Sequence, residues 1–189
     1  QEEEEEGMSF LDHLEALRFH LLRSVAAVLI LTVVAFLAKS IVFGVIILGP
    51  SKVDFFTYRV LCDIGNYLGV YALCIDELPF TIQSRQMTGQ FSMHMTSSFV
   101  VGFIAAFPYV FWEVWKFISP GLYDKEKSAA RGAVFFVSLL FLMGAAFGYY
   151  VLSPLSINFL ANYQLDPSIT NEFDITSYVT TLVMLVLAS

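Results

Sequence analysis

The segment GAVFFVSLLFLMGAAFGYYVLSPLSINFLANYQL, Gly132–Leu165, carries no charged side chain over a length that exceeds the thickness of a lipid bilayer. A helix needs about 20 apolar residues to cross the hydrocarbon core. Because that core holds no water, backbone polar groups there must bond within the protein, which leaves a helix or a closed barrel. The segment lacks the strict alternation of a barrel strand. It therefore predicts a spanning helix at about Ala129–Leu152, ending near Pro154.

Other apolar segments indicate the same kind of element. They run from Ser24 to Ala38 and on past Lys39 to Leu48, from Gln86 to Trp112 with a span at about Phe91–Phe117, and from Ile175 to Ser189. Only 14% of the 189 residues are charged, whereas a soluble domain carries about 25%. We therefore predict an all-α fold, a polytopic integral membrane helical bundle with three complete spans and the start of a fourth. Pro108 should kink the second span.

The two ends of the chain differ from this pattern. Residues 1–8 contain the acidic run Glu2–Glu6, which is typical of a solvated, disordered tail, so residues 9–189 are expected to form the transmembrane domain. Residues 9–24 follow, with apolar residues at helical spacing, and predict an amphipathic helix that leads into the first span. The last apolar run covers about 13 residues from Ser177, short of a complete span, so we expect the native protein to continue.

Basic residues predict the orientation, because cytoplasmic loops are enriched in Lys and Arg close to the membrane. They gather in the lead-in helix and in the turn between the second and third spans, at Arg18, Arg23, Lys116, Lys125, Lys127 and Arg131. They are sparse in the excursion Ser51–Arg85 and absent from the segment Asp166–Asp174. The N-terminus and the turn are therefore expected in the cytoplasm, and both excursions outside.

The two cysteines, Cys62 and Cys74, both lie in the first outward excursion. An oxidising compartment permits a disulfide, which we favour over two separate buried thiols. The bond would close a loop of about 13 residues and stabilise the fold by about 3 kcal/mol.

The sequence shows no catalytic set, and we expect no enzyme activity and no cofactor. The three histidines, His13, His20 and His94, have no partners at metal-ligand spacing. Phosphate-binding and nucleophile motifs are missing, and no basic aromatic stripe suggests nucleic acid.

What remains is a small set of charges close to the bilayer, where charges are costly and often functional: Glu15, Arg18, Glu113 and Glu126. We expect Glu113 to snorkel to the cytoplasmic interface beside Trp112 and Trp115, in a structural role. Composition leaves Glu126 open as either a binding residue or a solvated loop residue among lysines.

Four motifs together resemble one family. They are HLEALR at His13–Arg18, a first span ending in LGP at Pro50, FPYVFWEVWKFISPGLYDKEK from Phe107, and GYYVLSPLSINFL from Gly148. In this order they look like TatC of the bacterial twin-arginine translocase. The most specific part is W-x-F-I-x-P-x-L-x-x-x-E, from Trp115 through Pro120 to Glu126.

The resemblance implies a six-helix, concave membrane bundle in the bacterial plasma (inner) membrane, with a cytoplasmic N-terminus. Members of the family are receptors for the twin-arginine signal peptides of folded cargo. Their partners are the single-span proteins TatA and TatB, besides the lipid bilayer, and the proton-motive force drives transport. A homo-oligomer is possible.

Carried over residue by residue, the resemblance implies a signal-peptide site at Glu126, Phe117 and Arg18, with Glu15 beside it, and structural roles for Pro50, Pro108 and Pro120. One position departs: this chain has Ala16 where the family usually has a glutamate. Glu15 is adjacent, but one residue is about 100° of rotation along a helix.

Two other functions stay open on the residues alone. A small-solute transporter or channel subunit would need charged or broken-helix residues at mid-membrane, which the visible spans almost lack. A structural or assembly protein of the membrane is the third possibility.

Overall fold

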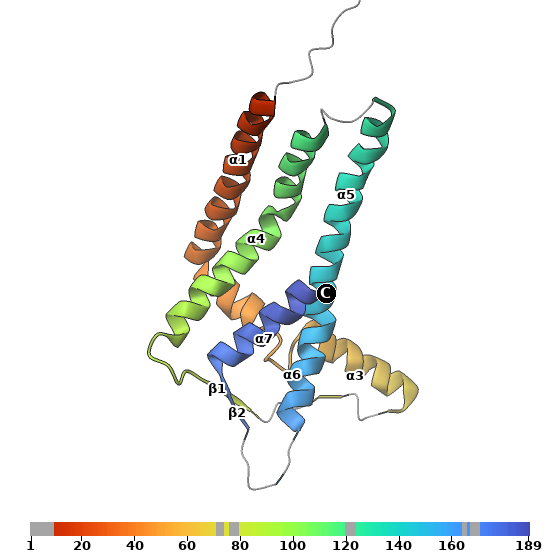
Figure 1. Ribbon diagram of the computed structural model, residues 1–189. Helices are drawn as coiled ribbons and strands as arrows, with labels where there is room; N and C mark the ends of the chain where they lie inside the picture. The colour runs from red at the N-terminus through yellow and green to blue at the C-terminus, as the bar shows by residue number, and fades with distance from the viewer. Residues whose placement is uncertain (1–9, 71–73, 76–79, 120–123, 164–165, 167–170) are drawn as a thin grey trace, which may run out of the picture.

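The computed structural model describes residues 10–70, 74–75, 80–119, 124–163, 166 and 171–189, with side chains described except at 10–14, 16 and 124–131. Three long helical segments lie side by side in one layer (Figure 1): α1 (Phe10–Leu37), α4 (Gly89–Ile118) and α5 (Asp124–Phe147). Among the described residues, the segments long and apolar enough to cross a membrane are Leu17–Leu37, Gly89–Ile118 and Gly132–Asn162. This confirms the predicted bundle and its three complete spans. The predicted acidic tail, residues 1–8, lies outside the described part.

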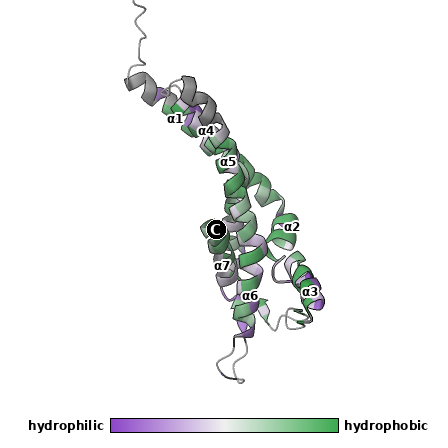
Figure 2. Cartoon of the chain, turned by 90° about the vertical axis from the view of Figure 1, so that its right-hand side faces the viewer, coloured by the Kyte–Doolittle hydropathy of each residue, from purple (hydrophilic) through white to green (hydrophobic). Residues whose placement is uncertain are grey.

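The layer is curved when it is viewed edge-on, and apolar residues cover most of the three long segments (Figure 2). Many large apolar side chains on these segments are exposed, among them Ile30, Leu37, Phe136 and Leu140. In water such a surface would be unstable. In lipid it is the expected outer face of a membrane protein, which agrees with the mean hydropathy of +0.70.

The third span does not end near Pro154, contrary to the prediction. Helix α5 continues through the π-helical segment η4 (Gly148–Leu152) into α6 (Ser153–Asn162), with Pro154 in the first turn of α6. A proline is tolerated in a first turn, because the N–H that it lacks would have no partner there. The span therefore reaches Asn162. Pro108, in turn, lies inside α4 without ending it.

Short elements lie at the end of the spans where α1 ends and α4 begins. After α1 come α2 (Lys39–Ile41) and the π-helical η1 (Val42–Ile47), then the short helix α3 (Phe56–Leu68) in the first excursion. The excursions also contain two strands that were not predicted, β1 (Thr81–Gln83) and β2 (Glu172–Asp174). They pair in parallel, with Ile82 opposite Phe173.

Asp174 ends β2 and caps α7 (Ile175–Ala188), the apolar helix that begins where a fourth span was expected. Its carboxylate accepts a hydrogen bond from the backbone N–H of Thr176 at 2.7 Å and one from the backbone N–H of Arg85 at 3.2 Å. The bond from Thr176 lowers the pKa of Asp174, and the bond from the Arg85 backbone and the positive charge of Arg85 act in the same direction. Arg85 also pairs with Glu172 at 3.0 Å. These contacts tie the two excursions together.

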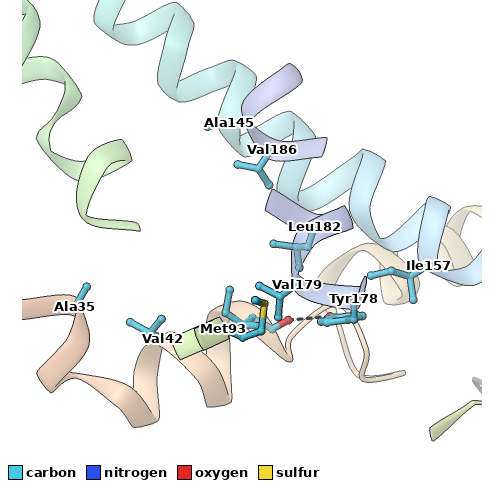
Figure 3. Close-up of a cluster of buried hydrophobic side chains, with 10 residues drawn as sticks. Ala35, Val42, Met93, Ala145, Ile157, Tyr178, Val179, Leu182 and Val186 are labelled. Carbon is cyan, nitrogen blue, oxygen red and sulfur yellow. Dashed lines mark hydrogen bonds between the residues drawn. The ribbon is translucent and has the colours of Figure 1, made fainter. Parts of the chain in front are cut away.

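The core lies where α7 meets the ends of the spans beside η1 (Figure 3). Its buried side chains come from α1, η1, α4, α5, α6 and α7, and include Ala35, Val42, Met93, Ala145, Ile157, Val179, Leu182 and Val186. Tyr178 of α7 extends toward η1, and its hydroxyl donates a hydrogen bond to the carbonyl of Ile47 at 2.8 Å. Helix α7 therefore joins segments that are far apart in the sequence.

Tyrosine hydroxyls bond the backbone carbonyls of the segment that follows α1. Tyr149 donates to Ile46 at 2.7 Å, and the hydroxyl of the buried Tyr58 lies 3.0 Å from the carbonyls of both Pro50 and Pro154. Burial raises the pKa of Tyr58, so its phenol remains a donor. Carbonyls in the last turn of a helix, such as that of Ile46 in η1, have no partner within the helix, and a buried unpaired carbonyl is costly.

Helices α1 and α4 pack closely against each other. Buried Ser98, Gly102 and Ala106 recur every four residues on α4, a spacing that places small residues on one face and lets two membrane helices approach closely. A Cβ added at Gly102 would lie 2.6 Å from the backbone nitrogen of Thr32 and 2.7 Å from its Cα. Only glycine fits there without a shift of α1.

We predict that Gly102→Ala destabilises the protein by about 1–3 kcal/mol, the usual cost of overpacking. The matched control is Gly44→Ala, because a Cβ at Gly44 meets nothing within 4 Å and alanine favours a helix over glycine. The measurement is thermal unfolding of the purified protein in detergent. Equal midpoints for the two variants would contradict the close α1–α4 contact.

Tyr58→Phe should also destabilise the protein, by about 1–3 kcal/mol, because it leaves carbonyls of Pro50 and Pro154 without their donor. Tyr67→Phe is the control, since Tyr67 lies on the same helix and is 91% exposed. The same unfolding assay compares them. A Tyr58→Phe variant as stable as Tyr67→Phe would show that the hydroxyl contributes nothing.

Candidate functional site

The predicted signal-peptide residues lie at one end of the bundle. Glu15 and Arg18 are exposed near the beginning of α1, Phe117 is half-buried in the last turn of α4, and Glu126 belongs to the first turn of α5. Those three helix ends lie at the same end of the layer (Figure 1). The side chain of Glu126 is outside the described residues, as is Pro120, so the structure brings Glu126 to this end by its backbone alone.

Glu113 is buried at this end, and the expectation that it snorkels to the interface is wrong. It is 1% exposed. Its Oε2 lies 2.7 Å from Nδ1 of His20 on α1, and its Oε1 lies 3.0 Å from Nζ of Lys116, one turn further along α4. A buried carboxylate is costly unless it is paired. Partners inside the protein, and not the aqueous interface, stabilise Glu113.

The pairing extends to aromatic side chains. The ring of His20 lies 6.5 Å from the ring of Phe117, tilted by 58°. Nζ of Lys116 lies 5.8 Å from the ring centroid of Trp112, within the range of a cation–π contact. Glu113 and Phe117 are four residues apart, so they lie on the same face of α4. His20 therefore contacts both a buried acid and a predicted peptide-binding ring.

Sequence reasoning did not find His20. Nothing in the spacing joins it to Glu113, because the two residues are separated by 93 positions. The sequence nevertheless held a signal for this pair. An acid inside a spanning helix needs a partner. Because neighbouring spans are antiparallel, the first turns of α1 lie beside the last turns of α4, where Glu113 is found.

The remaining predicted residues lie elsewhere. Pro50 is buried at the opposite end, where its carbonyl accepts from Tyr58. Cys62 and Cys74, which are bonded to each other in the structure, also lie at that end, after α1 and before β1. Among the residues that the structure describes, no group of three His, Cys, Asp or Glu side chains could hold a metal ion.

An apolar cavity of about 340 Å³ lies between α4, α5 and α7. Its lining includes Ile104 of α4, Leu142 of α5 and Val186 of α7, with Ser97 as a rare polar member. The hydroxyl of Ser97 has no hydrogen-bond partner in the structure. This cavity suits an apolar occupant and lies toward the middle of the spans, apart from the charged end of the bundle.

Comparison with known proteins identifies the family. The family model described as Sec-independent protein translocase protein (TatC) matches residues 12–189. The chain belongs to the TatC family. It is 36% identical over 98% of its length to the TatC of Blattabacterium from Periplaneta americana, of which it covers 70%. The TatC of Campylobacter jejuni is 33% identical over 88% of the chain and is covered to 60%.

A solved structure supports the same conclusion. The crystal structure of a twin-arginine translocase receptor, TatC, superposes with a TM-score of 0.64 at 26% identity and covers 93% of this chain. The chain in turn spans 68% of that crystallised protein. The family match over residues 12–189 extends over the spans and both excursions, so this chain is a multi-pass membrane protein with the TatC arrangement of helices.

Proposed function

We propose that this chain is the signal-peptide receptor and a core component of a twin-arginine translocase. The observation that carries the proposal is that the motif HLEALR and the most specific motif, which ends in Glu126, come to one end of the bundle. The motif HLEALR begins α1, and the motif that ends in Glu126 joins α4 to α5. A peptide bound there would contact three helices at the membrane surface.

The proposed recognition is between Glu126 and a guanidinium group of the peptide. Arginine favours bidentate pairing with a carboxylate, and such a charge-assisted bond is about twice as strong as a neutral one. Glu126 lies in the first turn of α5, where the helix dipole favours a negative charge. The neighbouring Lys125 and Lys127 also favour its ionised form. Phe117 would add an apolar contact beside the charged pair.

The same arrangement of helices suggests where the apolar part of the peptide binds and which partners the chain has. An apolar signal segment could lie along the concave layer toward the apolar cavity between α4, α5 and α7. We propose that the chain resides in a bacterial inner membrane with its N-terminus in the cytoplasm. TatA, TatB and lipid would be its partners, and the proton-motive force would drive transport. In this role the protein binds cargo and catalyses no reaction.

Glu126→Gln should weaken binding of a twin-arginine peptide. It keeps the shape but removes the charge, and we expect a loss of about 1–3 kcal/mol, or roughly 5- to 150-fold in affinity. Glu126→Lys should be worse, and Glu15→Gln milder. Asp124→Asn is the matched control, because it removes a carboxylate from the same turn. The measurement is binding of a labelled peptide to full-length protein in membranes, with a twin-lysine peptide as the competitor.

An unchanged affinity in a folded, inserted Glu126→Gln protein would remove the main support for the site. A wild-type protein that does not prefer the twin-arginine peptide to its twin-lysine analogue would contradict the proposed function itself.

The proposed orientation is tested by cysteine labelling in intact cells. A cysteine placed at Asn66 in α3 should react with a membrane-impermeant thiol reagent, and one placed at Lys127 should not. Disruption of the cells should make Lys127→Cys reactive, which serves as the control for accessibility. The opposite labelling pattern would show that the N-terminus faces outward and would contradict the proposed orientation.

A further inference from the structure

We propose that His20 and Glu113 form a buried latch that sets the position of α1 against α4 and thereby shapes the peptide site. The inference rests on the proposed function, and it assigns both side chains as positioning residues. The name latch refers to these two side chains, with Lys116 as the second partner of Glu113.

Glu113 is poorly placed to bind a peptide arginine itself. One of its oxygens lies 2.7 Å from Nδ1 of His20 and the other lies 3.0 Å from Nζ of Lys116. Its side chain is 2% exposed, whereas that of His20 is 22% exposed. A guanidinium would have to displace one of these partners and enter the α1–α4 contact. The geometry therefore suits a support and not a ligand.

The latch bonds two helices that are otherwise joined here by apolar packing. The neighbours of His20 on α1, Leu21 and Leu22, are exposed at 60% and 55%, so they face lipid and do not hold this part of α1 against α4. Ser24 bonds within α1, to the carbonyl of His20 at 2.9 Å. Because a buried carboxylate without its partner is strongly unfavourable, Glu113 opposes any rotation of α1 that moves His20 away.

That restraint acts directly on the proposed site. Arg18 lies two residues before His20, and each residue of a helix turns by about 100°, so the rotation fixed at His20 decides where Arg18 points. On the other helix, the ring of His20 lies against Phe117. The latch therefore sets both the α1 and the α4 contributions to the site.

The test compares two single variants, His20→Ala and Glu113→Gln, with the exchanged pair His20→Glu/Glu113→His, which restores the contact in reverse. Arg23→Gln is the matched control, since it removes an exposed charge from α1 three residues away. Each is made in the full-length protein, with spin labels on cysteines at Phe19 and Ile118, exposed positions on α1 and α4. The readouts are the distance distribution between the labels and the affinity for a twin-arginine peptide.

We expect each single variant to broaden the distance distribution and to weaken peptide binding by about tenfold, which corresponds to about 1.4 kcal/mol. The exchanged pair should recover both, and Arg23→Gln should change neither. If His20→Ala does not insert, His20→Leu replaces it, because leucine fills the space and removes the hydrogen-bond donor.

Unchanged distances in both single variants would overturn the inference. A loss of affinity at unchanged distance would also overturn it, because Glu113 would then act as a ligand. The label distances are measured without peptide. They therefore decide the inference even if the wild-type protein fails to prefer the twin-arginine peptide, an outcome that would defeat the proposed function alone.

Discussion

The constraint on which this structure depends is that polar groups in the membrane must find partners within the chain. The bilayer core offers no water, so a charge or a free carbonyl there is costly. The fold meets this requirement at both ends of the layer. At one end His20 and Lys116 pair with Glu113. At the other, tyrosines from α3, η4 and α7 bond carbonyls at the end of η1 and in the residues that follow it.

The two ends are built differently. The end that carries α7 is connected by a disulfide, a parallel strand pair, tyrosine hydrogen bonds and the core around α7. The close α1–α4 contact at Gly102 lies nearer the middle of the spans. Among the described side chains, the latch joins α1 and α4 at the opposite end. The predicted binding residues lie at the end that holds the latch.

The resemblance implies a glutamate where this chain has Ala16. Glu15 is exposed on α1 but is turned by about 100° from that position. The glutamates in the helices at this end are thus Glu15 on α1, the buried Glu113 on α4 and Glu126 in the first turn of α5. Glu113 has both of its oxygens occupied by the chain itself.

The sequence by itself determined the fold class, the three complete spans and the motifs, because each depends on local composition and spacing. Uncharged runs such as Gly132–Leu165 identify a spanning helix without any knowledge of its neighbours. The tertiary structure alone decided which groups pair. The partner of Glu113, the acceptors of Tyr58 and the strand opposite Ile82 all lie far away in sequence. The predicted end of the third span near Pro154 was wrong for a related reason. A proline can follow the end of a helix or lie in the first turn of one, and the backbone on either side decides which. Long-range partners depend on how helices cross, and helix crossing depends on small residues whose contacts, like that of Gly102 with Thr32, exist only once the chain has folded.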